Sequence, residues 1–235
     1  MKLELNISPQ PDDTTCGPTC LHAVYRYYGE AYSLDQIIRE VTKLQDGGTL
    51  AVFMGCHALQ RDYDASIYTY NLHVFDPTWF QLPVHALSEK LREQLLFKLD
   101  PKLHCATHGY MEFLQGGGTI RFADLTGALL RSFLTHSIPI ITGLNSTFLY
   151  KCSREYVHDD KLLYDDVRGI STGHFVVLAG YDKEHRRVLI ADPSIPNPVS
   201  STPYYEVQMD HLISAIMLGI ITYDANLLIV QPKHK

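Results

Sequence analysis

The chain reads Gln10-Pro-Asp-Asp-Thr-Thr-Cys16-Gly-Pro-Thr-Cys20 at the start of a helical pattern with apolar residues on one face. Cys16 falls where this helix begins, and Pro18 suits its first turn. A helix N-terminus offers unpaired amides and a partial positive charge, and both favour a thiolate. Gln10 carries a side-chain amide that can donate to an oxyanion, as acyl chemistry requires. The stretch predicts a nucleophile at Cys16 and an oxyanion donor at Gln10. The alternative is a small buried thiol and a solvated amide.

Four further cysteines compete with Cys16 for the role of nucleophile. Cys20 lies one turn inside the same helix, away from the terminal amides, and is expected in the core. Cys56, Cys105 and Cys152 have no comparable setting and are expected to be ordinary thiols. An odd number of cysteines without close spacing argues against a disulfide framework and favours a reduced protein.

A thiol nucleophile needs a base, and the base needs an orienting group. His174 opens the apolar strand Gly173-His-Phe-Val-Val-Leu, and Asp192 closes the next one, Val188-Leu-Ile-Ala-Asp-Pro. If these strands form a hairpin about residue 183, the two side chains are cross-strand neighbours and meet on one face. The pattern predicts His174 as the base and Asp192 as the acid that orients it. The plain alternative is a strand end followed by an Asp-Pro turn.

These motifs, taken in order, resemble the papain-like cysteine peptidase superfamily. Within it, the chain looks most similar to the bacteriocin-processing peptidases, which cleave double-glycine leaders, and to their stand-alone relatives. The resemblance covers residues 10–29 and 138–195. It implies Cys16 as nucleophile, His174 as general base and acid, Asp192 as orienting acid and Gln10 as oxyanion donor. It also implies a helical lobe packed against a sheet lobe, with the active site between them.

Two departures from that family leave the reaction open. Between Cys16 and His174 lie 158 residues, more than the compact exporter-linked peptidases use, with helical insertions near 34–61 and 86–116. No transporter module follows, so the resemblance does not imply cleavage of an exported leader. The same motifs also resemble phytochelatin synthase, a papain-like enzyme that transfers an acyl group to a peptide amine.

The order of predicted elements indicates an α+β fold in one domain spanning 1–235. Helices are expected near 16–28, 34–44, 50–61, 89–99, 125–135 and 210–217, with Ser33, Thr49, Ser88 and Asp124 as candidate N-caps. Strands are expected near 65–72, 138–144, 174–181, 187–192 and 226–231. Residues of about 10–135 would form the helical lobe, and about 136–235 the sheet lobe.

The segment 145–173 is polar and lacks a clear period, so it is expected to be a long loop. It ends at His174 and must lie beside the active site if His174 is catalytic. We expect it to rim the cleft and to favour a positively charged substrate through its carboxylates. The carboxylates in question are Glu155, Asp159, Asp160, Asp165 and Asp166. The alternative is a surface excursion that covers the sheet edge.

Composition narrows the class of protein further. The 235 residues are 46% hydrophobic and 20% charged, which excludes a disordered chain. A net charge of −6 without a basic block argues against a nucleic-acid partner. The apolar run at 213–221 is too short to span a bilayer, and no signal-peptide core is visible, so a cytoplasmic protein is expected.

Other constellations carry weaker signals. His104 and His108 have helical metal-site spacing but lack a third ligand, so they are expected on a polar surface. Tyr204 and Tyr205 are candidates for lining a peptide groove. The sequence therefore predicts a thiol-dependent hydrolase that cleaves a peptide or amide bond without metal or organic cofactor. The alternatives are an acyl or peptidyl transferase with the same residues, a catalytically silent peptide-binding protein, and a metal-binding structural protein.

Overall fold

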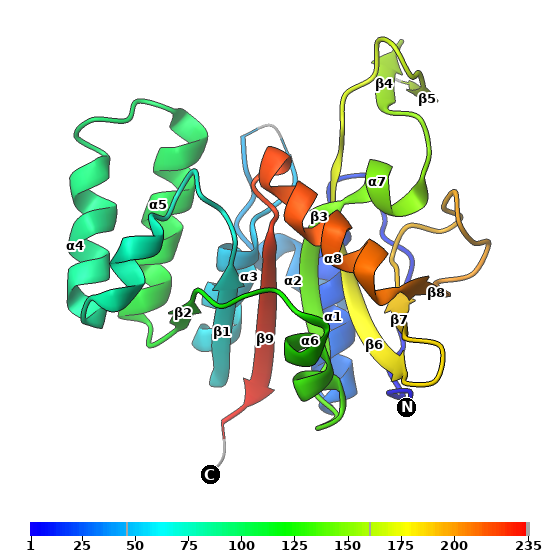
Figure 1. Ribbon diagram of the computed structural model, residues 1–235, viewed down its shortest axis with the longest axis horizontal. Coiled ribbons are helices and arrows are strands. Elements are labelled where there is room, and N and C mark those ends of the chain that lie inside the picture. Colours follow the sequence, from blue (N-terminus) through cyan, green and yellow to red (C-terminus); the bar gives the residue numbers. More distant parts are fainter. Residues whose placement is uncertain (46, 160, 234–235) are drawn as a thin grey trace.

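A seven-stranded sheet runs through the centre of the molecule, in the strand order β2-β1-β9-β3-β6-β7-β8 (Figure 1). The structure is a computed structural model that describes residues 1–45, 47–159 and 161–233. β1 and β2 are parallel, and the other neighbouring strands are antiparallel. The strands are β1 Tyr63–Thr69, β2 Thr119–Arg121, β3 Ile140–Asn145, β6 Gly173–Asp182, β7 Arg187–Ala191, β8 Tyr204–Gln208 and β9 Asn226–Pro232.

Helices lie on both faces of this sheet (Figure 1). α1 packs on β6, and α3 packs on β1 and β9; α8 contacts β3, β7 and β8, and α6 contacts β6. The helices are α1 Cys16–Tyr27, α2 Leu34–Glu40, α3 Ala51–Gln60, α4 Val84–Gln94, α5 Pro101–Gln115, α6 Gly127–Leu134, α7 Ser146–Tyr150 and α8 Met209–Leu218. Two 3-10 turns, η1 Pro77–Gln81 and η2 Gly219–Thr222, complete the set. The α+β class expected from the sequence is confirmed.

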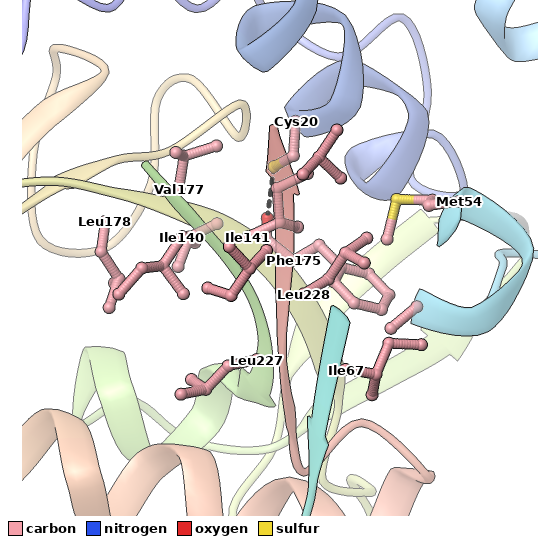
Figure 2. Packing of buried hydrophobic residues seen from close by; sticks show 14 of the residues in the cluster. Cys20, Met54, Ile67, Ile140, Ile141, Phe175, Val177, Leu178, Leu227 and Leu228 are labelled. Atoms are coloured by element: carbon pink, nitrogen blue, oxygen red, sulfur yellow. Dashed lines mark hydrogen bonds between the residues drawn. The ribbon is translucent and has the colours of Figure 1, made fainter. Parts of the chain in front are cut away.

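The buried hydrophobic side chains form one cluster between the sheet and its helices. Figure 2 shows part of it, with Cys20 of α1 directed toward the carbonyl of Phe175 in β6. The Cys20 Sγ lies 3.3 Å from that oxygen, and the residue is fully buried. This contact joins the helix that begins at Cys16 to the strand that carries His174. Cys20 is a core residue, as expected.

Several helix starts differ from those expected. Leu50, and not Thr49, is the N-cap of α3, because the Thr49 hydroxyl donates to the carbonyl of Thr42 at 2.7 Å. Ser88 lies inside α4, which begins five residues earlier than predicted. Thr126 caps α6 in place of Asp124, since its hydroxyl accepts the N–H of Leu129. In each case the sequence pattern locates the helix but not its first residue.

The pattern also misses elements. The predicted helix near 89–99 is in fact the end of α4, and a new helix, α5, starts after Asp100, whose carboxylate accepts the N–H of Lys102. β2 and β8 are short strands without a predicted counterpart. β1 and β2 come from the part of the chain expected to form the helical lobe, yet they join the central sheet.

The segment 145–173 is not a loop throughout. It contains α7 and a separate hairpin formed by β4 Glu155–His158 and β5 Lys161–Tyr164. In Figure 1 this hairpin projects beyond the edge of the main sheet. Its strands are too short and too polar to give a period-two signal in the sequence. Asp160, one of the carboxylates singled out above, lies outside the described residues.

No helix within the described ranges has both the length and the apolar composition of a membrane span.

Candidate active site

Cys16 is the first residue of α1, as the sequence predicted, and its side chain is half-buried. The helix itself cannot engage the main-chain N–H of a residue at this position. Gly17 follows, because the start of α1 packs closely on the segment just before α3. A Cβ at Gly17 would lie 2.5 Å from the side chain of Thr49. The Cys-Gly pair thus sets the thiol at the helix end with an open amide beside it.

His174 and Asp192 form a buried pair beside this thiol. His174 Nε2 lies 2.9 Å from Asp192 Oδ1, and His174 is 8% exposed while Asp192 is fully buried. The pKa of His174 is raised by Cys16 as well as by Asp192, so the thiol lies near the same imidazole ring, and Nδ1 is the ring nitrogen that Asp192 leaves open to it. The structure therefore brings Cys16, His174 and Asp192 together from α1, β6 and the end of β7.

β6 and β7 form the predicted hairpin, but its register differs from the predicted one. The expectation places Asp192 directly opposite His174. The observed pairing sets Val177 opposite Ala191, so that the next step places Asp192 opposite Val176, two residues from His174. Side chains alternate between the faces of a sheet, so a shift of two residues keeps both groups on one face.

A β-bulge in β6 makes this shared face possible. The pairing slips by one residue between Leu178 and Gly180. If the pairing of Tyr181 with Val188 continued without that slip, Asp192 would fall opposite Val177 and would face away from His174. The bulge therefore aims the histidine at its carboxylate, which no local sequence pattern reveals.

Asp192 is held by four hydrogen bonds. Its Oδ1 accepts from His174 and from the main-chain N–H of Ser194 at 2.9 Å. Its Oδ2 accepts from the hydroxyl groups of Tyr150 at 2.9 Å and Tyr205 at 2.6 Å. The two tyrosines stand on α7 and β8. Tyr205 thus supports the acid of the site, and its place in a peptide groove stays a prediction. Tyr204 instead donates to the carbonyl of Leu5.

These contacts determine how the pair titrates. Burial works to lower the pKa of His174, but the charge and hydrogen bond of Asp192 outweigh it, and Cys16 adds to their effect. The pKa of His174 therefore lies well above its ordinary value. Burial works to raise the pKa of Asp192, and His174, Tyr205 and the Ser194 amide bring it below its ordinary value instead. The arrangement favours a charged pair, an imidazolium beside a carboxylate.

A cleft of about 370 Å³ opens beside Cys16. Residues 170–173, from the segment that precedes His174, form one wall, and residues 47–50 form another. The expectation that the end of segment 145–173 lies at the site agrees with this wall. Three ionisable side chains, those of Asp13, Lys102 and the buried Asp224, also line the cleft.

Gln10 lies on the turn that leads into α1. Its Nε2 donates to the carbonyl of Asp12 at 2.9 Å, and its main-chain N–H donates to the carbonyl of Pro193, the residue after Asp192. The side-chain amide keeps a second N–H, which is the group an oxyanion would need. The structure thus places Gln10 between the end of β7 and the start of α1, with its oxyanion role still a prediction.

The remaining thiols and histidines lie elsewhere. Burial raises the pKa of Cys20 well above its ordinary value, and it raises that of Cys56 to about 12. His104 and His108 sit on α5, and each donates from one ring nitrogen to a main-chain carbonyl, that of Lys98 and that of His104. In the parts of the chain with assigned structure, no three His, Cys, Asp or Glu side chains are grouped to hold a metal ion.

Comparisons with known proteins place the chain beside several peptidases. No protein-family model matches the chain, and no curated protein sequence does. The peptidase domain of Streptococcus ComA, a bifunctional ABC transporter involved in a quorum-sensing pathway, is 14% identical with a TM-score of 0.45 over 98% of this chain and 100% of that chain. A double-glycine-motif protease from an AMS/PCAT transporter, solved with the leader peptide, is 16% identical with a TM-score of 0.46 over 99% and 94%.

A third similar structure is xylellain, a cysteine protease from Xylella fastidiosa. It is 13% identical with a TM-score of 0.43, over 99% of this chain and 85% of that chain.

Proposed function

We propose that the protein is a thiol-dependent hydrolase that cleaves a peptide or amide bond through a Cys16 thioester. The observation that supports the proposal is the buried pair of His174 and Asp192, 2.9 Å apart, with Cys16 near enough to the imidazole to help raise its pKa. A thiol, a base in contact with it and an acid that orients the base are the parts that nucleophilic catalysis requires.

The groups of the site act in turn in the proposed reaction. His174 holds the proton of Cys16 as an imidazolium, and the thiolate sulfur attacks the carbonyl carbon of the substrate. The oxyanion accepts hydrogen bonds from the Cys16 N–H and from the free N–H of Gln10. His174 then gives its proton to the leaving amine, and the C–N bond breaks. Water, deprotonated by His174, attacks the thioester and releases the acid and the free thiol.

Alkylation tests the nucleophile directly. Brief treatment with iodoacetamide near neutral pH, followed by peptide mapping, is expected to label Cys16 before the other four cysteines, because His174 activates it. His174→Ala is expected to abolish this preference. Faster labelling of Cys152 or Cys105 would assign the reactive thiol elsewhere.

Turnover of a peptide library, followed by mass spectrometry, tests the reaction. Cys16→Ala is expected to abolish turnover while leaving thermal unfolding nearly unchanged. Gln10→Ala is expected to lower turnover by about 10²-fold and to leave alkylation of Cys16 intact, since it removes only an oxyanion donor. The same assay with an added amine reports whether water or the amine resolves the thioester. Full turnover by Cys16→Ala would refute the proposal.

A further inference from the structure

A second carboxylate lies in the cleft beside Cys16 and takes no part in the proposed reaction. Asp224 lies between η2 and β9, two residues before Asn226. It is 7% exposed, and it lines the cleft. Its main-chain N–H donates to the carbonyl of Gly219 at 2.8 Å, which fixes the turn that carries it.

The carboxylate of Asp224 packs against the residue before His174. A Cβ at Gly173 would lie 2.0 Å from Asp224 Oδ2 and 2.5 Å from Thr222 Oγ1. Only glycine fits at this position, because any side chain would displace the carboxylate. Asp224 therefore lies at the start of β6, against the residue that precedes His174.

This carboxylate has little to compensate its burial. In the portion of the chain that the structure describes, no Lys, Arg or His nitrogen lies within 4.0 Å of it, and the nearby Thr222 hydroxyl donates to the carbonyl of Gly219 at 3.1 Å. Lys102 and His174 act on it from greater distance. Burial raises the pKa of Asp224 to about 7, against the opposing effects of Thr222, Lys102 and His174. A buried acid without an ion-pair partner is costly to keep, and a cationic ligand would compensate that cost.

We propose that Asp224 determines specificity by binding a positively charged group of the substrate, an ammonium or a guanidinium, next to Cys16. This inference rests on the proposed function, since it names the class of substrate for that site. A cation in the cleft would form a charge-assisted hydrogen bond with the carboxylate in a place of low water access.

The groups that face Asp224 determine how strongly it attracts a cation. Lys102 of α5 and a protonated His174 of β6 oppose a cationic ligand, whereas Asp13, on the cleft wall before α1, favours one. The hydroxyl of Tyr110, on α5, faces the same carboxylate and carries no charge near neutral pH. The attraction grows as Asp224 ionises, so that it increases through neutral pH.

Three thiol reagents of different charge test the proposal without knowledge of the substrate. They are the 2-aminoethyl, methyl and 2-sulfonatoethyl methanethiosulfonates, which are cationic, neutral and anionic. The rate of Cys16 modification by each is measured by mass spectrometry and divided by the rate for a small free thiol. At pH 8 the cationic reagent is expected to exceed the neutral one by about tenfold. The anionic reagent is expected to be the slowest.

Variants test whether the preference of Cys16 for the cationic reagent depends on Asp224. Asp224→Asn is expected to reduce the cationic preference to about that of the free thiol, and lowering the pH from 8 to 6 is expected to reduce it several-fold in the wild type. Lys102→Met is expected to increase it. Asp13→Asn, a second carboxylate of the same cleft, is expected to change it by less than twofold.

The outcomes separate this inference from the proposed function. Two results overturn the role of Asp224 and leave the proposed function standing. One is rapid modification of Cys16 by the neutral reagent with no preference for the cationic one. The other is an equal loss of that preference in Asp13→Asn and in Asp224→Asn. Slow modification of Cys16 by all three reagents, relative to the other cysteines, contradicts the proposed function instead.

Discussion

At the scale of single residues, Asp192 is the most constrained group of the site. It is fully buried and charged, and it accepts hydrogen bonds from His174, Ser194, Tyr150 and Tyr205. A carboxylate in such a setting stays ionised because each oxygen accepts two hydrogen bonds. It therefore fixes both the orientation of the His174 ring and the charge on it.

Asp192→Asn tests this coupling. The amide keeps the shape of the side chain but removes the charge that raises the pKa of His174. The pKa of His174 is then expected to fall, so that the alkaline limb of the kcat/KM profile, which reports loss of the imidazolium proton, moves to lower pH. Turnover is expected to fall by about 10²-fold or more, but by less than in His174→Ala, because the base remains.

Tyr205→Phe is the matched control for this variant. It removes one hydrogen bond from Asp192 and keeps the charge, so a loss of about fivefold is expected, with the alkaline limb near its wild-type position. An equal shift of the limb in both variants would mean that packing, and not charge, controls His174.

Which residues could be predicted depends on where their partners lie. Cys16, His174 and Asp192 each stand at the end of a helix or strand that the hydrophobic pattern reveals, so their positions follow from the sequence. Tyr150 and Asp224 become visible only through contacts between distant elements. Nothing near them in the chain distinguishes them from a core tyrosine or a turn aspartate.

At the scale of elements, two features connect the outer parts of the chain to the site. The bulge in β6 turns His174 toward Asp192, as described above. The β4–β5 hairpin is connected to the cleft wall: Glu155 and Ile170 exchange main-chain hydrogen bonds of 3.1 and 2.8 Å, and the Thr172 hydroxyl donates to the Glu155 carboxylate at 2.9 Å. The hairpin can thus hold the wall formed by residues 170–173 in place.

Replacing residues 154–168 by a short Gly/Ser bridge tests whether the hairpin restricts entry. We expect the shortened protein to accept a wider range of peptides in the library assay, because the wall loses its support. Alkylation of Cys16 is expected to continue at the wild-type rate. Thr172→Val, which removes only the link to Glu155, is expected to produce a smaller change in the same direction. Unchanged specificity in the shortened protein would show that the hairpin only covers the sheet edge.

At the scale of the whole molecule, the site depends on contacts that no local pattern encodes. β9, near the C-terminus, lies between β1 and β3 and joins the first half of the sheet to the second. The sequence predicts most of these strands and the α+β class, but not their order, because order follows from pairing between segments far apart in the chain. Asp224 reaches the cleft only through this central position of β9.

The burial of Asp224, His174 and Asp192 makes the stability of the molecule depend on pH. The folded-state pKa of Asp224, about 7, lies above its ordinary value of 3.8, so the folded protein holds this proton more tightly than the unfolded chain does. The stability that this proton contributes is present below pH 3.8 and is lost as the pH rises through 7. His174, whose folded-state pKa is also raised, loses its contribution as the pH rises from 6.5 through that higher value. Asp192 acts in the opposite direction, because its folded-state pKa is lowered. Its contribution to the stability of the fold is present above pH 3.8 and is lost as the pH falls below that value.

Asp224→Asn isolates one of these contributions, because the amide resembles the neutral acid at every pH. We expect the variant and the wild type to unfold at similar temperatures at pH 4, and the variant to be more stable by about 2–4 kcal/mol at pH 8. Calorimetric unfolding across this range, with the exposed Asp64→Asn as control, measures the difference. The control is expected to follow the wild type, because a solvated carboxylate has nearly the same surroundings in the folded and unfolded chain. A stability difference in Asp224→Asn that stays constant with pH would mean that Asp224 does not change its ionisation between pH 4 and 8, and that the cleft carries no buried charge for a cation to meet.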